Sequence, residues 1–249
     1  MGFWPIVLNV LRNSDVVLLL VDARMPELTR NSEIVSKVES MKDKRLFIVF
    51  NKSDLICHKE MDKLKEEYLD AFFISAKNKT GVSKLKETLE NMAENWYRPS
   101  LRVGLVGYPN VGKSTLINIL APSIYSKVSS IPGTTKKTTW VRNGKLRIMD
   151  SPGVIPFRDQ NVQMGMSAAK DPHKIRNPEK VALKIIEFLM KKDEKILKKY
   201  YGASGEDSYE VFLDIGKKKG FLVKGGEVNE NRVAIKVIDD WQKGKINLK

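Results

Sequence analysis

The sequence of 249 residues lacks several features, and each absence excludes a class of protein. It has a single cysteine, Cys57, so a disulfide framework and a cysteine-based metal site are both excluded. Its longest purely apolar run, Val16–Val21, is far too short to cross a bilayer. The first residues, MGFWPIVLNVL, have neither a basic leader nor a small-residue cleavage site, which predicts no secretion signal. We therefore expect a reduced, cytoplasmic protein.

Acidic residues are also scarce relative to basic ones. The chain has 30 Asp+Glu against 44 Lys+Arg, a formal net charge of +14. The excess is spread along the chain, with +9 in residues 1–170 and +5 in residues 171–249. A folded protein with this balance is attracted to polyanions, so the composition favours RNA as a partner. A generically basic protein has the same composition, so charge alone does not identify the partner.

The first two-thirds of the chain alternate short apolar runs with amphipathic segments. Several runs are apolar throughout, as expected for strands whose sheet is covered on both faces. The segments between them are rich in Lys, Glu and Leu at helical spacing. This alternation predicts an α/β fold with a mostly parallel sheet. The predicted strands are Val16–Asp22, Arg45–Phe50, Ala71–Ile74, Arg102–Val106, Thr138–Arg142 and Leu146–Met149, and the predicted helices are Ser32–Ser40, Lys59–Leu69 and Ser83–Trp96.

After residue 170 the pattern changes and predicts a small all-α domain at residues 171–249, following a first domain at residues 1–170. Asn177-Pro178-Glu179 combines an N-cap residue, proline at the first helical position and an early acid, which indicates a helix start. Two later helical segments, Ser208–Lys219 and Asn231–Lys243, each stop at a glycine. The residues predicted to be buried are Val181, Ala182, Ile185 and Leu189 in the first helix, Tyr209, Phe212 and Leu213 in the second, and Val233, Ala234, Val237, Ile238 and Trp241 in the third.

Residues 107–114, GYPNVGKS, match the pattern of a phosphate-binding loop (P-loop). The apolar run RVGLV precedes them and the helical run STLINIL overlaps and follows, which is the context that this loop requires. The two glycines let backbone N–H groups turn towards a phosphate at a helix N-terminus, where anions are favoured. We expect Lys113 to reach the β- and γ-phosphates and the Ser114 hydroxyl to bind Mg²⁺. The expected contacts of this loop with nucleotide are Asn110, Val111, Gly112, Lys113, Ser114 and Thr115.

A second motif, Asp150-Ser151-Pro152-Gly153, follows a predicted strand downstream of the P-loop. At that place Asp150 is expected to hold Mg²⁺ through water, and the N–H of Gly153 is expected to contact the γ-phosphate. By itself, Asp-x-Pro-Gly is an ordinary turn. Its position after a strand and downstream of the P-loop favours a metal-binding motif instead. Between the two motifs lies SSIPGTTKK, in which Thr135 is the expected second Mg²⁺ ligand and Thr134 the alternative.

The tetrapeptide Asn51-Lys52-Ser53-Asp54 ends another predicted strand and is the pattern that recognises guanine. Asn51 is expected to fix the loop, the stem of Lys52 to lie along the base, and Asp54 to accept from guanine N1–H and N2–H₂. That bidentate, charge-assisted pairing excludes adenine. After the next strand, Ser75, Ala76 and Lys77 supply the companion loop, whose backbone N–H contacts guanine O6.

These elements are those of a Ras-like GTPase domain in a shifted order, with the base-recognising loops before the phosphate loops. A circular permutation preserves every contact, provided that the old termini can be joined and the new ones lie at the surface. The join is expected near Pro99. The fold class is therefore a circularly permuted Ras-like P-loop GTPase domain, with a mostly parallel sheet flanked by helices, followed by the helical domain.

This order of motifs is accompanied by the DARMP motif at 22–26, by Asn31 and by the segment IGKKKGFLVKGGEVN at 215–229. In these features nearly the whole chain resembles the circularly permuted YlqF/RbgA family. The resemblance implies a GTPase that hydrolyses GTP to GDP, with Mg²⁺, as a switch in assembly of the large ribosomal subunit. It also implies that the helical domain contacts ribosomal RNA. For that contact we single out Lys217, Lys218 and Lys219, although lysines at a helix end also complement the helix dipole.

The resemblance implies that four residues take part in hydrolysis: Lys113, Asn110, Thr135 and Gly153. Resemblance to potassium-dependent GTPases suggests that Asn110 ligates K⁺, or else that it braces the loop. Val154 stands where Ras-like enzymes have the glutamine that orients water, which predicts slow intrinsic turnover. Bacterial members have an N-terminal histidine, proposed to help hydrolysis, that this chain lacks. Of its two histidines, His58 is expected to be exposed at a helix start. His173 is expected to be solvated or to cap a helix, and a role in hydrolysis is the alternative because it follows the switch region after Gly153.

Two other functions fit part of the sequence. A GTP-dependent RNA-binding switch acting on transfer RNA or the small ribosomal subunit would use the same motifs. A P-loop kinase or ATPase would use the phosphate loop alone, but Asn51-Lys52-Ser53-Asp54 and Ser75-Ala76-Lys77 argue against it.

Overall fold

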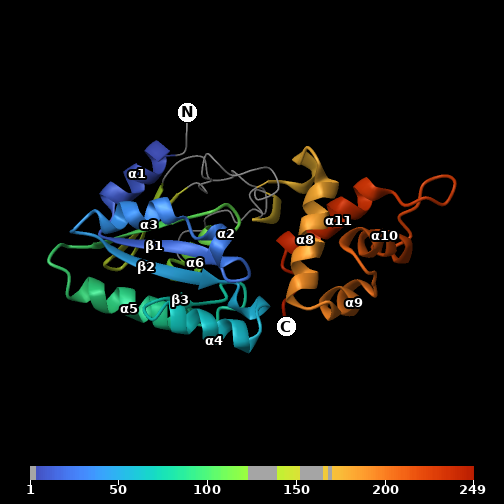
Figure 1. Ribbon diagram of the computed structural model, residues 1–249. Helices are drawn as coiled ribbons and strands as arrows, with labels where there is room; N and C mark the ends of the chain where they lie inside the picture. The colour runs from blue at the N-terminus through green and yellow to red at the C-terminus, as the bar shows by residue number, and fades with distance from the viewer. Residues whose placement is uncertain (1–3, 123–138, 152–164, 168–169) are drawn as a thin grey trace. The chain divides into compact units, whose positions relative to one another are not determined.

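The computed structural model describes residues 4–122, 139–151, 165–167 and 170–249, and they fall into two compact units (Figure 1). The first unit is Met1–Asp54 with His58–Phe157, and the second is Leu55–Cys57 with Arg158–Lys249. The domain boundary predicted from the sequence, between residues 170 and 171, stays a prediction. Among the described residues, no helix is long and apolar enough to span a membrane.

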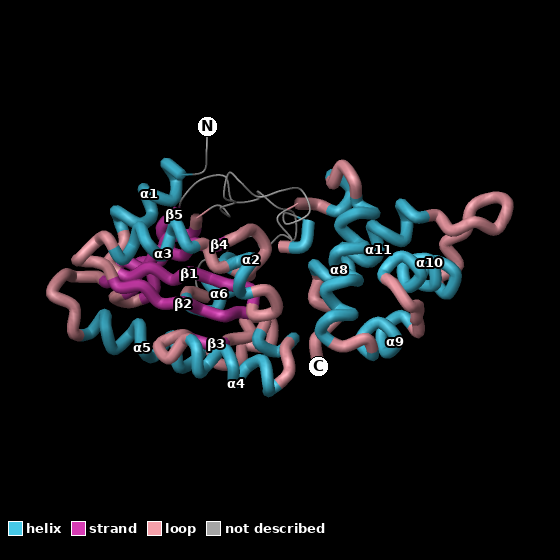
Figure 2. The backbone as a smooth tube through the Cα atoms, in the orientation of Figure 1, coloured by secondary structure: helices cyan, strands magenta, loops and turns pink. Residues whose placement is uncertain are grey.

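Within the described residues, the first unit contains one sheet of six strands in the order β3-β2-β1-β4-β6-β5. Its strands are drawn in magenta in Figure 2. All neighbouring pairs are parallel except β5 with β6, which are antiparallel at one edge. The central strands are apolar and buried because helices cover both faces. The mostly parallel sheet confirms the predicted fold class. The strands are β1 Val16–Asp22, β2 Arg45–Asn51, β3 Phe72–Phe73, β4 Leu101–Gly107, β5 Thr139–Asn143 and β6 Leu146–Asp150.

The helices of the first unit lie on the two faces of this sheet (Figure 1). On one face α5 and α6 pack on alternate side chains of the strands, such as Leu18 and Leu105, to form the core. On the other face α1 comes so close to β4 that a Cβ on Gly104 would lie 2.2 Å from the Ser14 Oγ. The helices are α1 Trp4–Asn13, α2 Pro26–Thr29, α3 Ser32–Glu39, α4 His58–Glu67, α5 Val82–Glu94 and α6 Lys113–Leu120, with a 3-10 turn, η1, at Ser53–Leu55.

The second unit is built from helices. Helix α8 packs against α10 and α11, and all five residues predicted to be buried in the last helix are fully buried, Trp241 among them. The Trp241 Nε1 donates to the Met166 carbonyl at 2.9 Å, which ties α11 to the segment before α8. The elements are η2 Pro172–Lys174, α8 Pro178–Lys192, α9 Lys195–Tyr201, α10 Ser208–Lys218 and α11 Glu230–Gln242.

One burial prediction in this unit is wrong. Tyr209 lies in the first turn of α10 with 46% of its surface exposed, and its hydroxyl donates to Glu230 at 2.8 Å. The fully buried aromatic residue of this helix is Phe212, and Leu213 is only half-buried. The buried face of α10 is made by Val211, Phe212 and Ile215.

Buried polar groups hold the second unit together around Asp240, which is fully buried. Its carboxylate accepts from the Tyr201 hydroxyl at 3.0 Å, from Lys236 at 2.9 Å and from Lys245 at 3.0 Å. Burial would raise the pKa of Asp240, but the hydrogen bonds from Lys236, Lys245 and Tyr201 hold it below its ordinary value. The carboxylate is therefore ionised and joins α9, α11 and the residues after α11.

Candidate functional site

The predicted guanine loop, the predicted P-loop and the DARMP motif meet at the carboxyl ends of three neighbouring strands. Asp22 ends β1, Asn51 ends β2 and Gly107 ends β4, and the sheet register pairs Asp22 with Asn51 and Leu20 with Gly107. Ligands of open parallel sheets bind at this edge because the loops that leave the strands gather there. The sheet thus brings the predicted guanine loop and the predicted P-loop side by side.

The P-loop has the backbone conformation that its glycines were expected to allow. Gly107, Asn110 and Gly112 have φ angles of 147°, 57° and 102°, all in the range that side chains rarely adopt. A Cβ on Gly112 would lie 2.1 Å from the Asn51 Nδ2, so glycine is required there for a second reason. Lys113 starts α6, and its Nζ donates to the carbonyls of Gly107 at 3.0 Å and Tyr108 at 2.6 Å.

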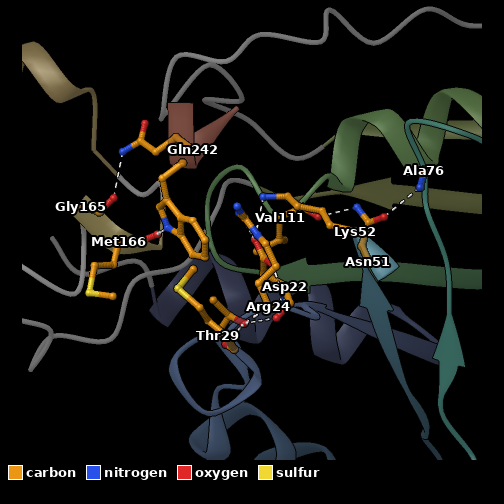
Figure 3. A network of polar contacts seen from close by, with 12 residues as sticks. Asp22, Arg24, Thr29, Asn51, Lys52, Ala76, Val111, Gly165, Met166 and Gln242 are labelled. Atoms are coloured by element: carbon orange, nitrogen blue, oxygen red, sulfur yellow. Dashed lines mark hydrogen bonds and ion pairs between the residues drawn. The ribbon is translucent and has the colours of Figure 1, made fainter. Parts of the chain in front are cut away.

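Asn51 joins the P-loop to the loop that follows β3. Its Nδ2 donates to the Val111 carbonyl at 2.7 Å, and its Oδ1 accepts from the Ala76 N–H at 2.9 Å (Figure 3). Its backbone carbonyl accepts from the Ala23 N–H at 2.9 Å. Asn51 is only 3% exposed, and its side chain bonds to segments on both sides of β2. The amide must supply both a donor and an acceptor, which explains why asparagine is needed.

The guanine loop is also bonded to the residues on either side of Ser75-Ala76-Lys77. The Ser53 N–H donates to the Ile74 carbonyl at 3.1 Å. The Asp54 Oδ2 accepts from the side chain of Asn78 at 3.1 Å. Ser75 is fully buried and its Oγ accepts from the Asn78 N–H at 3.2 Å. Asn78 was not among the predicted site residues; its position directly after Ser75-Ala76-Lys77 is the only signal of it in the sequence.

A buried ion cluster lies beside the guanine loop. The Asp22 carboxylate accepts from Arg24 Nη2 at 2.8 Å and from Lys52 Nζ at 2.7 Å (Figure 3). The side chains of Asp22 and Arg24 are 3% and 0% exposed. Burial would raise the pKa of Asp22, but the charges of Arg24 and Lys52 and their hydrogen bonds hold it well below its usual range. The pKa of Lys52 is lowered by burial, against the opposing effect of Asp22.

The predicted metal ligands are only partly described. Ser114 lies in the first turn of α6, next to Lys113, and Asp150 is the last residue of β6, next to β4 in the sheet. A hydroxyl and a carboxylate are the oxygen ligands that Mg²⁺ prefers, so these two residues fit this ion. Thr134, Thr135, Gly153 and Val154 lie outside the described residues. Among the residues that are described, no group of three or more His, Cys, Asp or Glu side chains could hold a metal by itself.

The three lysines singled out for RNA differ in their surroundings. Lys217, Lys218 and Lys219 are all exposed at the end of α10. Lys218 donates to the Gly202 carbonyl and lies 3.4 Å from the Asp214 carboxylate, so it also connects α10 to the end of α9. The Lys219 ammonium lies 5.7 Å from the centre of the Tyr201 ring. Of the two histidines, both exposed, His58 opens α4 as expected, and His173 lies in η2.

Comparison with known proteins finds similar GTPases. Residues 102–212 match the family model described as 50S ribosome-binding GTPase. The chain is 33% identical over 261 residues to ribosome biogenesis GTPase A of Bacillus cereus, covering 96% of this chain and 86% of that protein. It is 39% identical over 245 residues to an uncharacterized GTP-binding protein of Methanocaldococcus jannaschii, and covers 65% of it. It is 34% identical to nucleolar GTP-binding protein 2 of Pneumocystis carinii, and covers 52% of it.

The chain thus spans less than two thirds of the archaeal and fungal relatives. Two solved structures of YlqF share the fold along nearly the whole chain. The GDP-bound form has a TM-score of 0.66 at 21% identity and covers 97% of this chain and 95% of its own. The GNP-bound form from T. maritima has a TM-score of 0.63 at the same identity. These matches support the order of elements that the sequence motifs indicated.

Proposed function

The chain belongs to the family of ribosome biogenesis GTPases A (YlqF/RbgA), and from this premise we propose that it binds GTP and hydrolyses it to GDP and phosphate as a switch in assembly of the large ribosomal subunit. The observation that carries the proposal is the pair of hydrogen bonds made by Asn51. They join a loop with the pattern that recognises guanine to a loop with the pattern that binds phosphate. A kinase or ATPase has no use for the first of these loops.

Each part of the nucleotide has a proposed contact. Asp54 accepts from the guanine edge, Lys52 packs its stem on the base, and the N–H groups of the Ser75-Ala76-Lys77 loop contact O6. The N–H groups of residues 110–115 surround the phosphates, with Lys113 between the β- and γ-phosphates. When bound, Mg²⁺ neutralises charge on those phosphates, with Ser114 and Asp150 as its ligands and Thr135 as a further one.

Asp54 provides the direct test of guanine recognition. Asp54→Asn removes the charge that pairs with N1–H and N2–H₂, so GTP affinity should fall by about 2–5 kcal/mol. The variant should gain affinity for xanthosine triphosphate, whose 2-oxo group accepts from the asparagine amide. Both affinities are measured by competition against a fluorescent nucleotide. Asp62→Asn, which changes an exposed carboxylate of α4, is the control and should bind GTP like the wild type. Unchanged GTP binding by Asp54→Asn would exclude the assignment.

The rate of hydrolysis tests the finer proposal about catalysis. Valine at position 154 cannot orient water, so intrinsic turnover should be slow, and K⁺ near Asn110 should substitute for an arginine finger. Asn110 is held at a positive φ of 57° within the P-loop, a strained conformation of the kind found at ligand sites. Rates are compared in K⁺ and Na⁺ at equal ionic strength. Equal rates would leave Asn110 with a bracing role only.

Sedimentation with purified ribosomal subunits tests the proposed partner. Binding to the large subunit should differ between a GTP analogue and GDP by about 1–3 kcal/mol, as for other coupled sites. It should fall with salt, because lysine contacts to phosphates release counterions. Binding to the small subunit alone, or to neither, would contradict the proposed role. Indistinguishable binding with GTP analogue, with GDP and without nucleotide would contradict the switch.

A further inference from the structure

We propose that Asp22 is a positioning residue of the guanine site: its carboxylate fixes the ammonium group of Lys52, and so holds the lysine stem where the base packs against it. The inference rests on the proposed function, since it assumes that Lys52 contacts guanine. It concerns a residue that makes no contact with nucleotide itself. Its starting point is the ion cluster beside the guanine loop.

The Asp22 carboxylate is fully occupied by protein groups. Its Oδ1 accepts from the Arg24 backbone N–H at 3.1 Å and from Arg24 Nε at 3.0 Å. Its Oδ2 accepts from Arg24 Nη2 at 2.8 Å and from Lys52 Nζ at 2.7 Å. A carboxylate has about four acceptor positions, so none is left for a metal ion or a ligand. The role open to Asp22 is to hold its partners in place.

The carboxylate is itself fixed from the backbone side. The Asp22 N–H donates to Thr29 Oγ1 at 3.0 Å, and that hydroxyl donates to the Met25 carbonyl at 2.8 Å. Asp22 is also the last paired residue of β1, opposite Asn51 in β2. The buried Arg24 side chain completes a rigid frame, because a two-point guanidinium–carboxylate pair fixes direction as well as distance.

Lys52 is the adjustable member of the cluster. Its side chain is 18% exposed, against 3% for Asp22, and its backbone φ is 63°. A lysine stem has four rotatable bonds, and ordering it costs conformational entropy on each binding event. The short contact to Asp22 removes that freedom before nucleotide arrives. Without Asp22, Arg24 and Lys52 would be two cations close together in a poorly solvated place, and Lys52 would turn away.

The chain contains a matched control residue at the other end of the same strand, β1. Asp15 directly precedes β1, as Asp22 ends it, and its carboxylate accepts from Arg102 at 2.6 and 3.0 Å. It is 5% exposed, and although burial would raise its pKa, hydrogen bonds and charge from Arg102 lower it. Asp15 lies at the amino end of β1, whereas the site lies at the carboxyl ends of the strands. Asp15→Asn therefore removes a comparable buried charge without touching the guanine loop.

The experiment measures GTP affinity and thermal unfolding without nucleotide for Asp22→Asn, Asp15→Asn, Lys52→Met and the Asp22→Asn/Lys52→Met double variant. Methionine keeps an apolar stem and removes the ammonium group. We expect Asp22→Asn to weaken GTP binding about tenfold, the scale of one hydrogen bond between charged groups. The double variant should bind no more weakly than Lys52→Met. Asp15→Asn should lower the unfolding temperature yet bind GTP within about twofold of the wild type.

Several results would overturn the proposal. Binding by Asp22→Asn within about twofold of the wild type would remove any role for the carboxylate, and losses that multiply in the double variant would show that Asp22 does not act through Lys52. Equal loss in Asp15→Asn would indicate general destabilisation. If Asp22→Asn does not fold, Asp22→Glu and Asp15→Glu replace the pair, with the same expectations. A wild-type protein that binds GTP no better than ATP would instead contradict the proposed function.

Discussion

The hydrogen bonds of Asn51 make Asn51→Ala the most informative single change in the first unit. Alanine removes the donor to the Val111 carbonyl and the acceptor for the Ala76 N–H. Both backbone groups belong to buried residues, at 1% and 4% exposure. Each unsatisfied buried group costs about 1–3 kcal/mol. For the two groups together we expect a loss of about 2–6 kcal/mol in the free energy of unfolding.

The same change should weaken GTP binding, because the loops are then no longer held in the binding arrangement before nucleotide arrives. If binding must restore an arrangement that costs about 2–3 kcal/mol, affinity falls by roughly 30- to 150-fold. Unfolding in urea without nucleotide gives the first quantity, and titration with fluorescent GTP gives the second. Both are needed, since a destabilised but competent protein would change only the first.

Asn143→Ala is the matched control. The Asn143 Nδ2 donates to the Leu120 carbonyl at 2.7 Å, an amide-to-carbonyl bond of the same kind and length, at the far end of β5. Its loss should cost about 1 kcal/mol of stability and leave GTP affinity unchanged. If Asn51→Ala binds GTP as tightly as Asn143→Ala does, the loops do not depend on Asn51 and the reasoning fails.

Other variants test the second unit. Asp240→Ala should lower the free energy of unfolding by about 2–4 kcal/mol, because it leaves a buried hydroxyl unpaired, whereas Asp239→Ala, at a partly exposed ion pair, should cost less than about 1 kcal/mol. The folded protein holds the pKa of Asp240 below 3.8, so the charge of Asp240 stabilises the fold above the ordinary carboxyl pKa, and this stabilisation is lost as the pH falls through the lowered value. The difference in free energy of unfolding between the wild type and Asp240→Asn, measured in urea, should therefore shrink between about pH 5 and pH 3. Lys217→Ala should weaken binding to large subunits without a stability change, and Lys218→Ala should reduce both, because Lys218 also bonds to the end of α9. Equal unfolding curves for the two lysine variants would contradict that distinction.

The sheet could be predicted from the sequence because its central strands are largely apolar runs. The predicted strand Val16–Asp22 has its observed bounds, and the other predicted strands agree with the observed ones to within one residue at each end. The P-loop and the guanine loop could be recognised because their function depends on neighbouring residues in a fixed spacing. The circular permutation then followed from order alone. Local patterns carry this information.

Other features could not be predicted, for physical reasons that differ. The helix Trp4–Asn13 was not assigned, although three apolar residues, Val7, Val10 and Leu11, form its buried face. Tyr209 has helical spacing with Phe212 and Leu213, but it lies in the first turn of its helix, where a side chain can leave the packed face. Spacing defines a face and does not define how far along the helix that face is covered.

The ion cluster was missed because its members are far apart in the sequence. Lys52 follows Asp22 by 30 residues, and no periodicity links them. Asp22 and Arg24 were noticed only as part of the DARMP motif. The pair of Asp22 with Arg24 is local, but the contact of Asp22 with Lys52 depends on the register of β1 with β2, which places the end of one strand beside the end of the other. Register in a parallel sheet is set by the whole packed structure rather than by adjacent residues.

The contacts that define the site explain why a permuted order of elements is tolerated. The bond from Asn51 to Val111 spans 60 residues, that from Ala76 to Asn51 spans 25, and that from Lys52 to Asp22 spans 30. All three run between neighbouring loops at one edge of the sheet, across strands and not along the chain. Such bonds depend on the order of strands in the sheet and are indifferent to which strand is synthesised first. What a permutation must preserve is therefore the spatial order β3-β2-β1-β4, and the buried groups that fix Asn51 and Lys52 are the places where a change in that order would be most costly.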